Sequence, residues 1–571
     1  MLSRRRFLQR SAGVGATSAL VFPNISCSAE RPPGGKKPRH IIHMVADGMS
    51  LGTLTCADHL SRILRGGRGL TWISLLNDPA VAGAWVNMRS LNSLVTDSAA
   101  AASSWGSGSR VINGSINQLP DGRDLKTLYE LFADKGWKRG LVTTTEVTHA
   151  TPAGFAANVN DRDTSARIAL QYLHRKIDLL LGGGRKFFDP KVRRDKRDLW
   201  KAFHRAGYHL METAGQLGSA PRQARWLGAF APSHLPFTVD HINDPLSREA
   251  VPTLAEMTSA ALGWLEPHRH FILQIEGGRV DQACHNCDIV SALRDMIAFD
   301  EALDVVLAFQ RRVADTLVVI TTDHGNGNPG LNGIGDAYGQ SNFLFERVLD
   351  VRESFPKILA RLRTVETLPP PDPKAGPRPA DSKGKPDESD SASHADDDTH
   401  ADDDDDSAIR DDVVMDDEEP GDGNDNGRAG RRRRRRARQR VTVASVGDII
   451  EGIRSATGFR IPPRKAEMLA DFLGRKGRAM FDQFNSETAQ LGHLMSNYTG
   501  LCFTGHSHTS DYVPLTALGP GSELFRGFLE NTDIFRFYTT LAGIDFRNPT
   551  EPLAAEATPG GRERIEEYQL G

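Results

Sequence analysis

The stretch HIIHMVADGMS, residues 40–50, decides the fold of the chain. Its apolar part, residues 40–46, is short and ends at Asp47, which is typical of a buried β-strand that stops at an acid. The same pattern recurs in RGLVTTT (139–145), IDLLL (177–181), FILQI (271–275) and TLVVITT (316–322). Stretches with helical spacing, such as residues 289–312, fall between several of these runs. The sequence therefore predicts an α/β fold, a three-layer sandwich with a mostly parallel central sheet and helices on both faces.

Length and charge narrow the classes of function. The chain has 571 residues, 39% of them apolar, so it can bury one large core with insertions or two to three domains. The net charge of −3 hides an asymmetry, because residues 381–440 hold 20 acidic against 12 basic residues. The rest of the chain is only mildly basic, and we expect no specific nucleic-acid partner.

The N-terminus predicts export. Residues 3–9, SRRRFLQ, resemble a twin-arginine signal, and the weakly apolar run at 12–22 is too short and too rich in small residues for a membrane span. A basic N-terminus arising by chance is the alternative. Cys27 stands where a lipoprotein would be cleaved and lipidated, although Asn24 replaces the usual leucine. We expect a signal segment at 1–30 and a periplasmic or cell-surface bacterial protein.

The cysteines do not predict a disulfide framework, since the long chain contains only five. Cys284 and Cys287 form a single C-x2-C pair, which is weak support for a structural zinc. Packing thiols or a redox-sensitive pair are the alternatives.

Metal-ligating side chains follow the predicted strands. In parallel sheets ligands bind beyond the carboxyl ends of the strands, so residues at those ends are candidates. Asp281 and His285 are one helical turn apart and can face one point. Carboxylate with imidazole suits zinc, and carboxylate with hydroxyl suits magnesium. The residues that follow the strands are Asp47, then His149, Thr151 and Arg162, then Glu276, Asp281 and His285, and finally Asp323 and His324.

A serine at the start of an alanine run provides a candidate nucleophile. In TDSAAAASS, residues 96–104, Asp97 precedes Ser98 and the alanines favour a helix. Ser98 then lies at a helix N-terminus, where free N–H groups and the dipole favour an anion. An ordinary helix cap is the alternative.

Six motifs stand out in the chain, HMVADGMS, VTDSAAAASSW, THATPAGFAANVNDR, IEGGRVDQACH, TTDHGNGN and GHSHTSDYVPLTALGPG. Together they resemble the alkaline phosphatase family. They cover residues 38–345 and 500–545 in the family's order, and several internal spacings match. The loop 325–328 departs from the family, since the Asp-His pair is followed by Gly-Asn-Gly-Asn.

The resemblance implies two zinc ions and one magnesium ion. His508 rather than His506 is the last zinc ligand, because the family places Gly-Pro eleven and twelve residues later, here Gly519-Pro520. The implied ligands are Asp281, His285 and His508 for the first zinc, Asp47, Asp323, His324 and the Ser98 oxygen for the second, and Asp47, Thr151 and Glu276 for magnesium.

The resemblance also implies the reaction. Phosphate monoesters are hydrolysed to alcohol and inorganic phosphate through a phosphoserine on Ser98, while Arg162 clamps the phosphate and Asp97 orients Arg162. Neighbouring positions are His149 beside the magnesium site, Gln282 after Asp281, and His506. Many relatives are dimers, which suggests a homodimer. A phosphodiesterase or sulfatase on the same scaffold, or a phosphate-binding protein without catalysis, are the alternatives. The phosphodiesterase and the sulfatase are disfavoured, because the chain has a serine in place of threonine or cysteine and because it retains Arg162.

The resemblance and composition divide the chain. The core is predicted at 38–350 and 499–548, with a tail at 549–571. Residues 366–440 are rich in Pro, then Ser and Asp, then Arg, and predict a disordered insertion, either a solvated tether or a polyanion-binding segment. Residues 441–498 carry helical spacing at 450–455, 463–474 and 480–496, and predict a helical cap that selects substrates.

Overall fold

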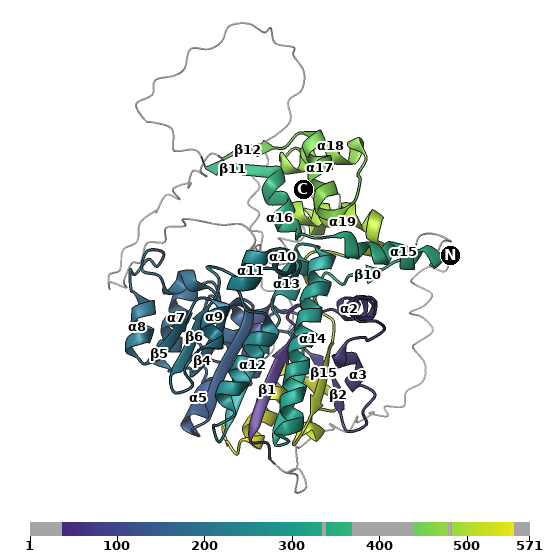
Figure 1. Cartoon of the computed structure of the whole chain (residues 1–571). Helices are drawn as coiled ribbons and strands as arrows, with labels where there is room; N and C mark the ends of the chain where they lie inside the picture. Colours follow the sequence, from purple (N-terminus) through teal and green to yellow (C-terminus); the bar gives the residue numbers. More distant parts are fainter. Residues whose placement is uncertain (1–36, 334–337, 368–438, 478, 480–481, 553–571) are drawn as a thin grey trace, which may run out of the picture. The chain divides into compact units, whose positions relative to one another are not determined.

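A computed structural model describes residues 37–333, 338–367, 439–477, 479 and 482–552 (Figure 1). The predicted signal segment, Cys27 and most of the C-terminal tail lie outside these residues. So does most of the predicted charged insertion. The first two residues of the predicted insertion, 366–367, and its last two, 439–440, belong to an antiparallel pair of strands. These strands are β11 (Arg363–Thr367) and β12 (Gln439–Val443).

The core is one ten-stranded sheet in the order β16-β2-β15-β8-β1-β7-β3-β4-β6-β5. β15 runs antiparallel to both of its neighbours, and the other pairings are parallel. The predicted mostly parallel sheet is therefore confirmed. Its strands are β1 (His40–Val45), β2 (Ala82–Asn87), β3 (Lys138–Glu146), β4 (Leu179–Gly183), β5 (Tyr208–Met211), β6 (Arg225–Ala229), β7 (Phe271–Glu276), β8 (Thr316–Thr321), β15 (Val513–Leu518) and β16 (Gly527–Glu530).

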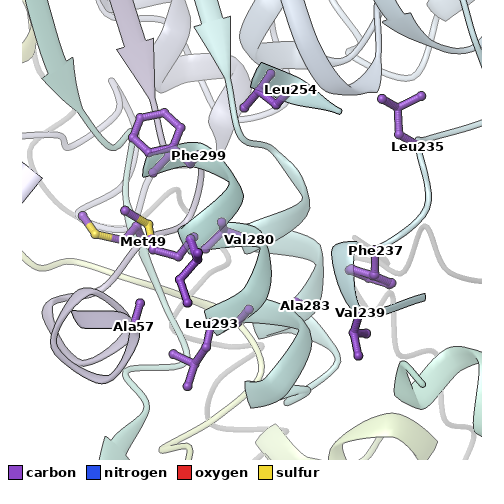
Figure 2. Packing of buried hydrophobic residues seen from close by; sticks show 14 of the residues in the cluster. Met49, Ala57, Leu235, Phe237, Val239, Leu254, Val280, Ala283, Leu293 and Phe299 are labelled. Atoms are coloured by element: carbon purple, nitrogen blue, oxygen red, sulfur yellow. The ribbon is translucent and has the colours of Figure 1, made fainter. Parts of the chain in front are cut away.

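Both faces of the sheet are covered. Every residue of β1 is buried, and its side chains alternate between two clusters, with Ile42 and Met44 in one and Ile41 and Val45 in the other. Figure 2 shows part of the first cluster, where Val280 and Leu293 pack near Met49. The helices of the core are α2 (Leu51–Leu64), α3 (Thr71–Leu75), α4 (Ser98–Ser107), α5 (Leu128–Asp134), α6 (Ala150–Gly154), α7 (Ser165–His174), α8 (Leu199–Arg205), α9 (Ala214–Gly218), α10 (Thr238–Asn243), α11 (Pro245–Ala250), α12 (Leu254–Leu265), α13 (Arg279–His285), α14 (Ile289–Arg312) and α20 (Asn531–Leu541).

The helix α4 is held close to α6 by two glycines. A Cβ atom on Gly106 would lie 1.8 Å from the carbonyl oxygen of Gly154, and one on Gly154 would lie 2.4 Å from Cβ of Ala102. Only a residue without a side chain permits this approach. The contact fixes the middle and the C-terminal end of α4 against α6, the helix that carries Thr151.

A group of helices lies between β10 (Gly330–Leu331) and β13 (Leu501–Cys502), which pair with each other. These are α15 (Ser341–Glu346), α16 (Phe355–Leu362), α17 (Val446–Thr457), α18 (Pro463–Leu473) and α19 (Glu487–Thr499). The last helix begins later than the predicted 480, because Ser486 caps it by accepting from the backbone N–H of Ala489. Among the helices that the structure describes, none has the length and apolar character needed to cross a bilayer.

Candidate active site

Ser98 is the first residue of α4 and is buried. Asp97 is the N-cap, and its Oδ1 accepts the backbone N–H of Ala100 at 2.9 Å. Ser98 Oγ lies 3.1 Å from Nε2 of His324. The serine that was predicted at a helix N-terminus therefore lies there, with its hydroxyl directed at a histidine from the end of β8.

The first set of metal-donor atoms comes from Asp281, His285 and His508, whose ligand atoms lie within 4.8 Å of one another. Asp281 and His285 are on α13, and His508 is in the short strand β14 (His508–Thr509). His285 Nε2 is 3.2 Å from Asp281 Oδ2 and 3.0 Å from His508 Nε2. The predicted one-turn spacing thus brings both α13 side chains to one point.

Backbone carbonyls fix the tautomers of these histidines. His285 Nδ1 donates to the carbonyl of His506 at 2.7 Å, and His508 Nδ1 donates to the carbonyl of Thr96 at 2.9 Å. Since a carbonyl can only accept, both Nδ1 atoms carry the proton, and the two Nε2 lone pairs face each other and Asp281. Two lone pairs 3.0 Å apart repel each other, and a cation bound between them would remove this repulsion. His506 contributes its backbone oxygen to this arrangement.

The second set comes from Asp47, Asp323 and His324, all fully buried and again within 4.8 Å. His324 Nε2 is 3.2 Å from Asp323 Oδ2 and 3.6 Å from Asp47 Oδ1. His324 Nδ1 donates to the carbonyl of Gly325 at 3.3 Å, which again leaves Nε2 for the site. Ser98 Oγ lies at this same nitrogen.

The third set comes from Asp47, Glu276 and His149. Thr151 Oγ1 donates to Asp47 Oδ2 at 3.2 Å, so the predicted hydroxyl is at the same place. Asp47 belongs to two of the sets, and it links them across the end of β1. The predicted residues from the ends of four strands are therefore brought together.

The buried carboxylates fit metal ions. Within the described residues, Asp47 Oδ1, Glu276 Oε1 and Asp323 Oδ2 are buried and have no hydrogen-bond donor. Burial and the charges of Asp323, Asp281 and Glu276 raise the pKa of Asp47 well above its ordinary value. Asp281 is buried as well, and ring nitrogens of His285, His508 and His324 lie within 4.0 Å of its carboxylate. Buried acids with open oxygens are stable when cations bind them.

Arg162, in the loop after α6, contacts Asp97, the residue directly before Ser98. Its Nη1 donates to Asp97 Oδ2 at 3.1 Å, and its Nη2 lies 3.3 Å from His149 Nε2. Asp97 Oδ2 also accepts the N–H of Gly114 at 2.8 Å. Asp97 therefore holds the helix carrying Ser98 with one oxygen and the guanidinium of Arg162 with the other.

Comparison with known proteins identifies the family. The family model described as alkaline phosphatase matches residues 38–423, which is more than half of the chain. The chain belongs to the alkaline phosphatase family.

Individual relatives support the assignment. Alkaline phosphatase 3 of Bacillus subtilis is 35% identical over 273 residues, covering 45% of this chain and 57% of that protein. Streptomycin-6-phosphate phosphatase of Streptomyces griseus is 32% identical over 366 residues, covering 56% of this chain and 80% of that protein. The crystal structure of Thermus thermophilus alkaline phosphatase has a TM-score of 0.72 at 27% identity, covering 94% of this chain and 96% of that one. The chain thus spans little more than half of the Bacillus subtilis relative.

Sequence reasoning missed several residues of this site. Thr143 and Thr145 donate to Glu276 Oε2, and Asn326 Nδ2 donates to Asp281 Oδ1 at 2.8 Å. The sequence could have pointed to these residues. Asn326 belongs to the loop 325–328, which departs from the family, and Thr143 and Thr145 lie at the end of a predicted strand. His234, whose ring lies 5.9 Å from that of His149, had no such signal in the sequence.

The cysteines beside His285 are not bonded to each other. Cys284 and Cys287 are free thiols, both buried, and burial raises the pKa of each. Gln282, between Asp281 and these cysteines, lies 3.0 Å from a ring nitrogen of His234.

Proposed function

We propose that the chain hydrolyses phosphate monoesters to an alcohol and inorganic phosphate through a phosphoserine on Ser98. The observation that carries this proposal is the meeting of Ser98 Oγ with His324 Nε2 at 3.1 Å, beside two donor sets and near Arg162. Alkaline phosphatase family membership and a phosphatase relative with 80% coverage support it.

Zinc is proposed at the first two donor sets and magnesium at the third. The sets with imidazole nitrogen and carboxylate oxygen suit zinc, and the carboxylates of Asp47 and Glu276 with the Thr151 hydroxyl suit magnesium. His149 is a member of the third set, and an imidazole ligand would favour zinc there. Metal analysis of the purified protein distinguishes zinc from magnesium. Bound metal ions would lower the pKa of the attacking oxygen and stabilise the leaving oxygen.

The protein's own groups position the phosphate. The N-terminus of α4 provides free N–H groups and a positive dipole end at Ser98. Arg162 provides a planar fork that can bind two phosphate oxygens, and Asp97 holds that fork in place. Ser98 Oγ loses its proton and attacks phosphorus as the ester bond breaks, and the departing alkoxide takes up one proton, which balances the one that Ser98 has lost. Water then hydrolyses the phosphoserine, which releases phosphate and restores Ser98.

A substrate panel tests the proposal. We expect purified protein to release p-nitrophenol from p-nitrophenyl phosphate much faster than from the bis-ester or the sulfate. Ser98→Ala should abolish this activity with metal content retained, and Ser219→Ala, an exposed serine on the surface, should not change it. Chelation should remove activity and lower the melting temperature, since ions that bind only the folded state stabilise it. Preference for the bis-ester or the sulfate would favour the alternative hydrolases, and normal activity of Ser98→Ala would contradict the proposal.

The helices α17 to α19, which correspond to the predicted cap at residues 441–498, are proposed as a cap beside the site. Support comes from α19, where a Cβ atom on Gly492 would lie 2.5 Å from the carbonyl oxygen of Cys287, two residues after the ligand candidate His285. A Gly492→Val substitution should therefore alter relative rates on small and bulky phosphate esters. Equal changes on both kinds of ester would contradict a selective role.

A homodimer and export are proposed as well. The side chains of Leu51, Trp85, Tyr512 and Phe528 are each at least 45% exposed and line one groove of about 570 Å³. Trp85→Asp should shift the mass measured by light scattering from dimer to monomer if this face joins two copies. Export is proposed from the twin-arginine motif, with periplasmic location and Cys27 lipidation read out by fractionation and mass spectrometry. Replacement of Arg4 and Arg5 by Lys should keep the protein in the cytoplasm.

A further inference from the structure

We propose that His234, in the loop after β6, is a positioning residue for phosphate binding, which holds the Gln282 amide on one side and supports His149 and Arg162 on the other. The inference rests on the proposed function, because it concerns the same phosphate site. It assigns a role to a histidine that lies outside all three donor sets.

The loop that carries His234 is fixed to the end of β3. The backbone N–H of Leu235 donates to the carbonyl of Thr144 at 2.9 Å, and Ser233 Oγ donates to Glu146 Oε1 at 2.7 Å. The backbone N–H of Glu146 donates to His234 Nδ1 at 3.2 Å. Leu235 and Phe237 on the same loop belong to the buried cluster (Figure 2), so the imidazole is held by a rigid support.

His234 engages one end of the Gln282 amide. Gln282 Nε2 donates to Nδ1 of His234 at 3.2 Å, and the same nitrogen accepts the backbone N–H of Glu146. A neutral ring that accepts at Nδ1 carries its proton on Nε2, so the 3.0 Å approach of Gln282 Nε2 to that nitrogen is not a second hydrogen bond. Arg279 Nη1 donates to Oε1 of the same amide. The guanidinium of Arg279 lies 3.6 Å from the centre of the Phe237 ring, so the His234 loop also supports this second partner. Because both ends of the amide have partners, Gln282 has one orientation.

His234 also lies against the residues that face the phosphate. Its ring packs edge-on against that of His149, with centroids 5.9 Å apart. His149 Nε2 in turn lies 3.3 Å from Arg162 Nη2. The series from Gln282 through His234 and His149 to Arg162 joins α13 to the loop after α6.

Loss of the imidazole should weaken phosphate binding more than catalysis. Without His234, the Gln282 amide and the His149 ring gain rotational freedom that phosphate binding must then remove. A neutral hydrogen bond of this kind corresponds to roughly a 3- to 10-fold change in an equilibrium constant. The proposed role concerns phosphate binding and not the attacking oxygen, so the maximal rate should change less than about twofold.

The test measures inorganic phosphate binding by calorimetry and by competitive inhibition of the full-length, metal-loaded protein. The variants are His234→Ala, His234→Asn, and the control His204→Asn, an exposed histidine on α8. We expect His234→Ala to weaken phosphate binding about 3- to 10-fold and to raise KM with kcat nearly unchanged. His234→Asn keeps a polar acceptor for the Glu146 N–H and should lie closer to wild type.

The decisive control is the Gln282→Ala background. If His234 acts through Gln282, the His234→Ala substitution should weaken phosphate binding much less there than in the wild type. An unchanged phosphate affinity in His234→Ala would overturn the inference, and so would an equal effect in both backgrounds. A wild-type protein that binds phosphate but hydrolyses no monoester would contradict the proposed function instead, because calorimetry reads binding without turnover.

Discussion

The Asp97→Asn substitution separates two functions of one carboxylate. Oδ1 caps α4 through the N–H of Ala100, and Oδ2 accepts from Gly114 and Arg162. In the Asp97→Asn variant, the side-chain oxygen can still cap α4. The amide nitrogen, which is itself a donor, then faces two other donors, the N–H of Gly114 and Nη1 of Arg162. We therefore expect α4 to remain capped and Arg162 to lose its anchor.

The size of the effect follows from the bonds that are lost. Arg162 and Asp97 form a partly buried ion pair at 3.1 Å, and hydrogen bonds to charged groups contribute about 1.5–3 kcal/mol. If that energy orients the guanidinium for the phosphate, kcat/KM should fall roughly 10- to 150-fold. Asp97→Ala also loses the cap, and should unfold about 1 kcal/mol more easily than Asp97→Asn.

A double-mutant cycle on p-nitrophenyl phosphate hydrolysis tests this explanation. With Arg162→Ala already present, Asp97→Asn should change kcat/KM less than about twofold, because there is no guanidinium left to position. Urea unfolding gives the stability of each variant in parallel. A full 10-fold loss in both backgrounds would refute a positioning role for Asp97.

Two further predictions concern the packing that holds the site. Gly154→Ala places a Cβ atom 2.4 Å from Cβ of Ala102 and should destabilise the protein by about 1–3 kcal/mol and lower kcat. The control Gly215→Ala, where a Cβ atom meets open space, should change neither the stability nor kcat. Equal melting temperatures for the two variants would contradict the close approach of α4 and α6. Burial lowers the pKa of His43 to about 3, against about 6.5 in the unfolded chain, so its contribution to stability is complete above pH 6.5 and is lost as the pH falls. Wild type should therefore lose about 2 kcal/mol more than His43→Gln between pH 7 and pH 5 in urea unfolding, and parallel pH profiles would contradict this.

Much of the site could be predicted from the sequence, because its residues follow buried strands directly. Asp47 and Glu276 come at the ends of apolar runs, and a parallel sheet places such ends at one edge. The spacing of Asp281 and His285 predicted their common face on α13, which is confirmed at 3.2 Å. These features depend on local pattern and on sheet geometry alone.

The remaining features depend on tertiary packing. The sheet edge formed by β2 and β16 has Trp85 and Phe528 exposed, so it lacks the continuous apolar run that marked the central strands. His234 follows β6, a short strand that was not predicted, and only the fold brings it to Gln282 and His149. The carbonyls that fix the histidine tautomers, such as that of Thr96, are likewise invisible in the sequence.

The most direct test of the central claim is to trap the phosphoenzyme. The metal-loaded protein is incubated with a phosphate monoester, quenched in acid, digested and examined by mass spectrometry. We expect one added phosphoryl group on the peptide that contains Ser98, and none in Ser98→Ala or in the chelated protein. Rapid monoester hydrolysis by a Ser98→Ala variant, or a phosphoryl group on a different residue, would contradict the role of Ser98 as nucleophile.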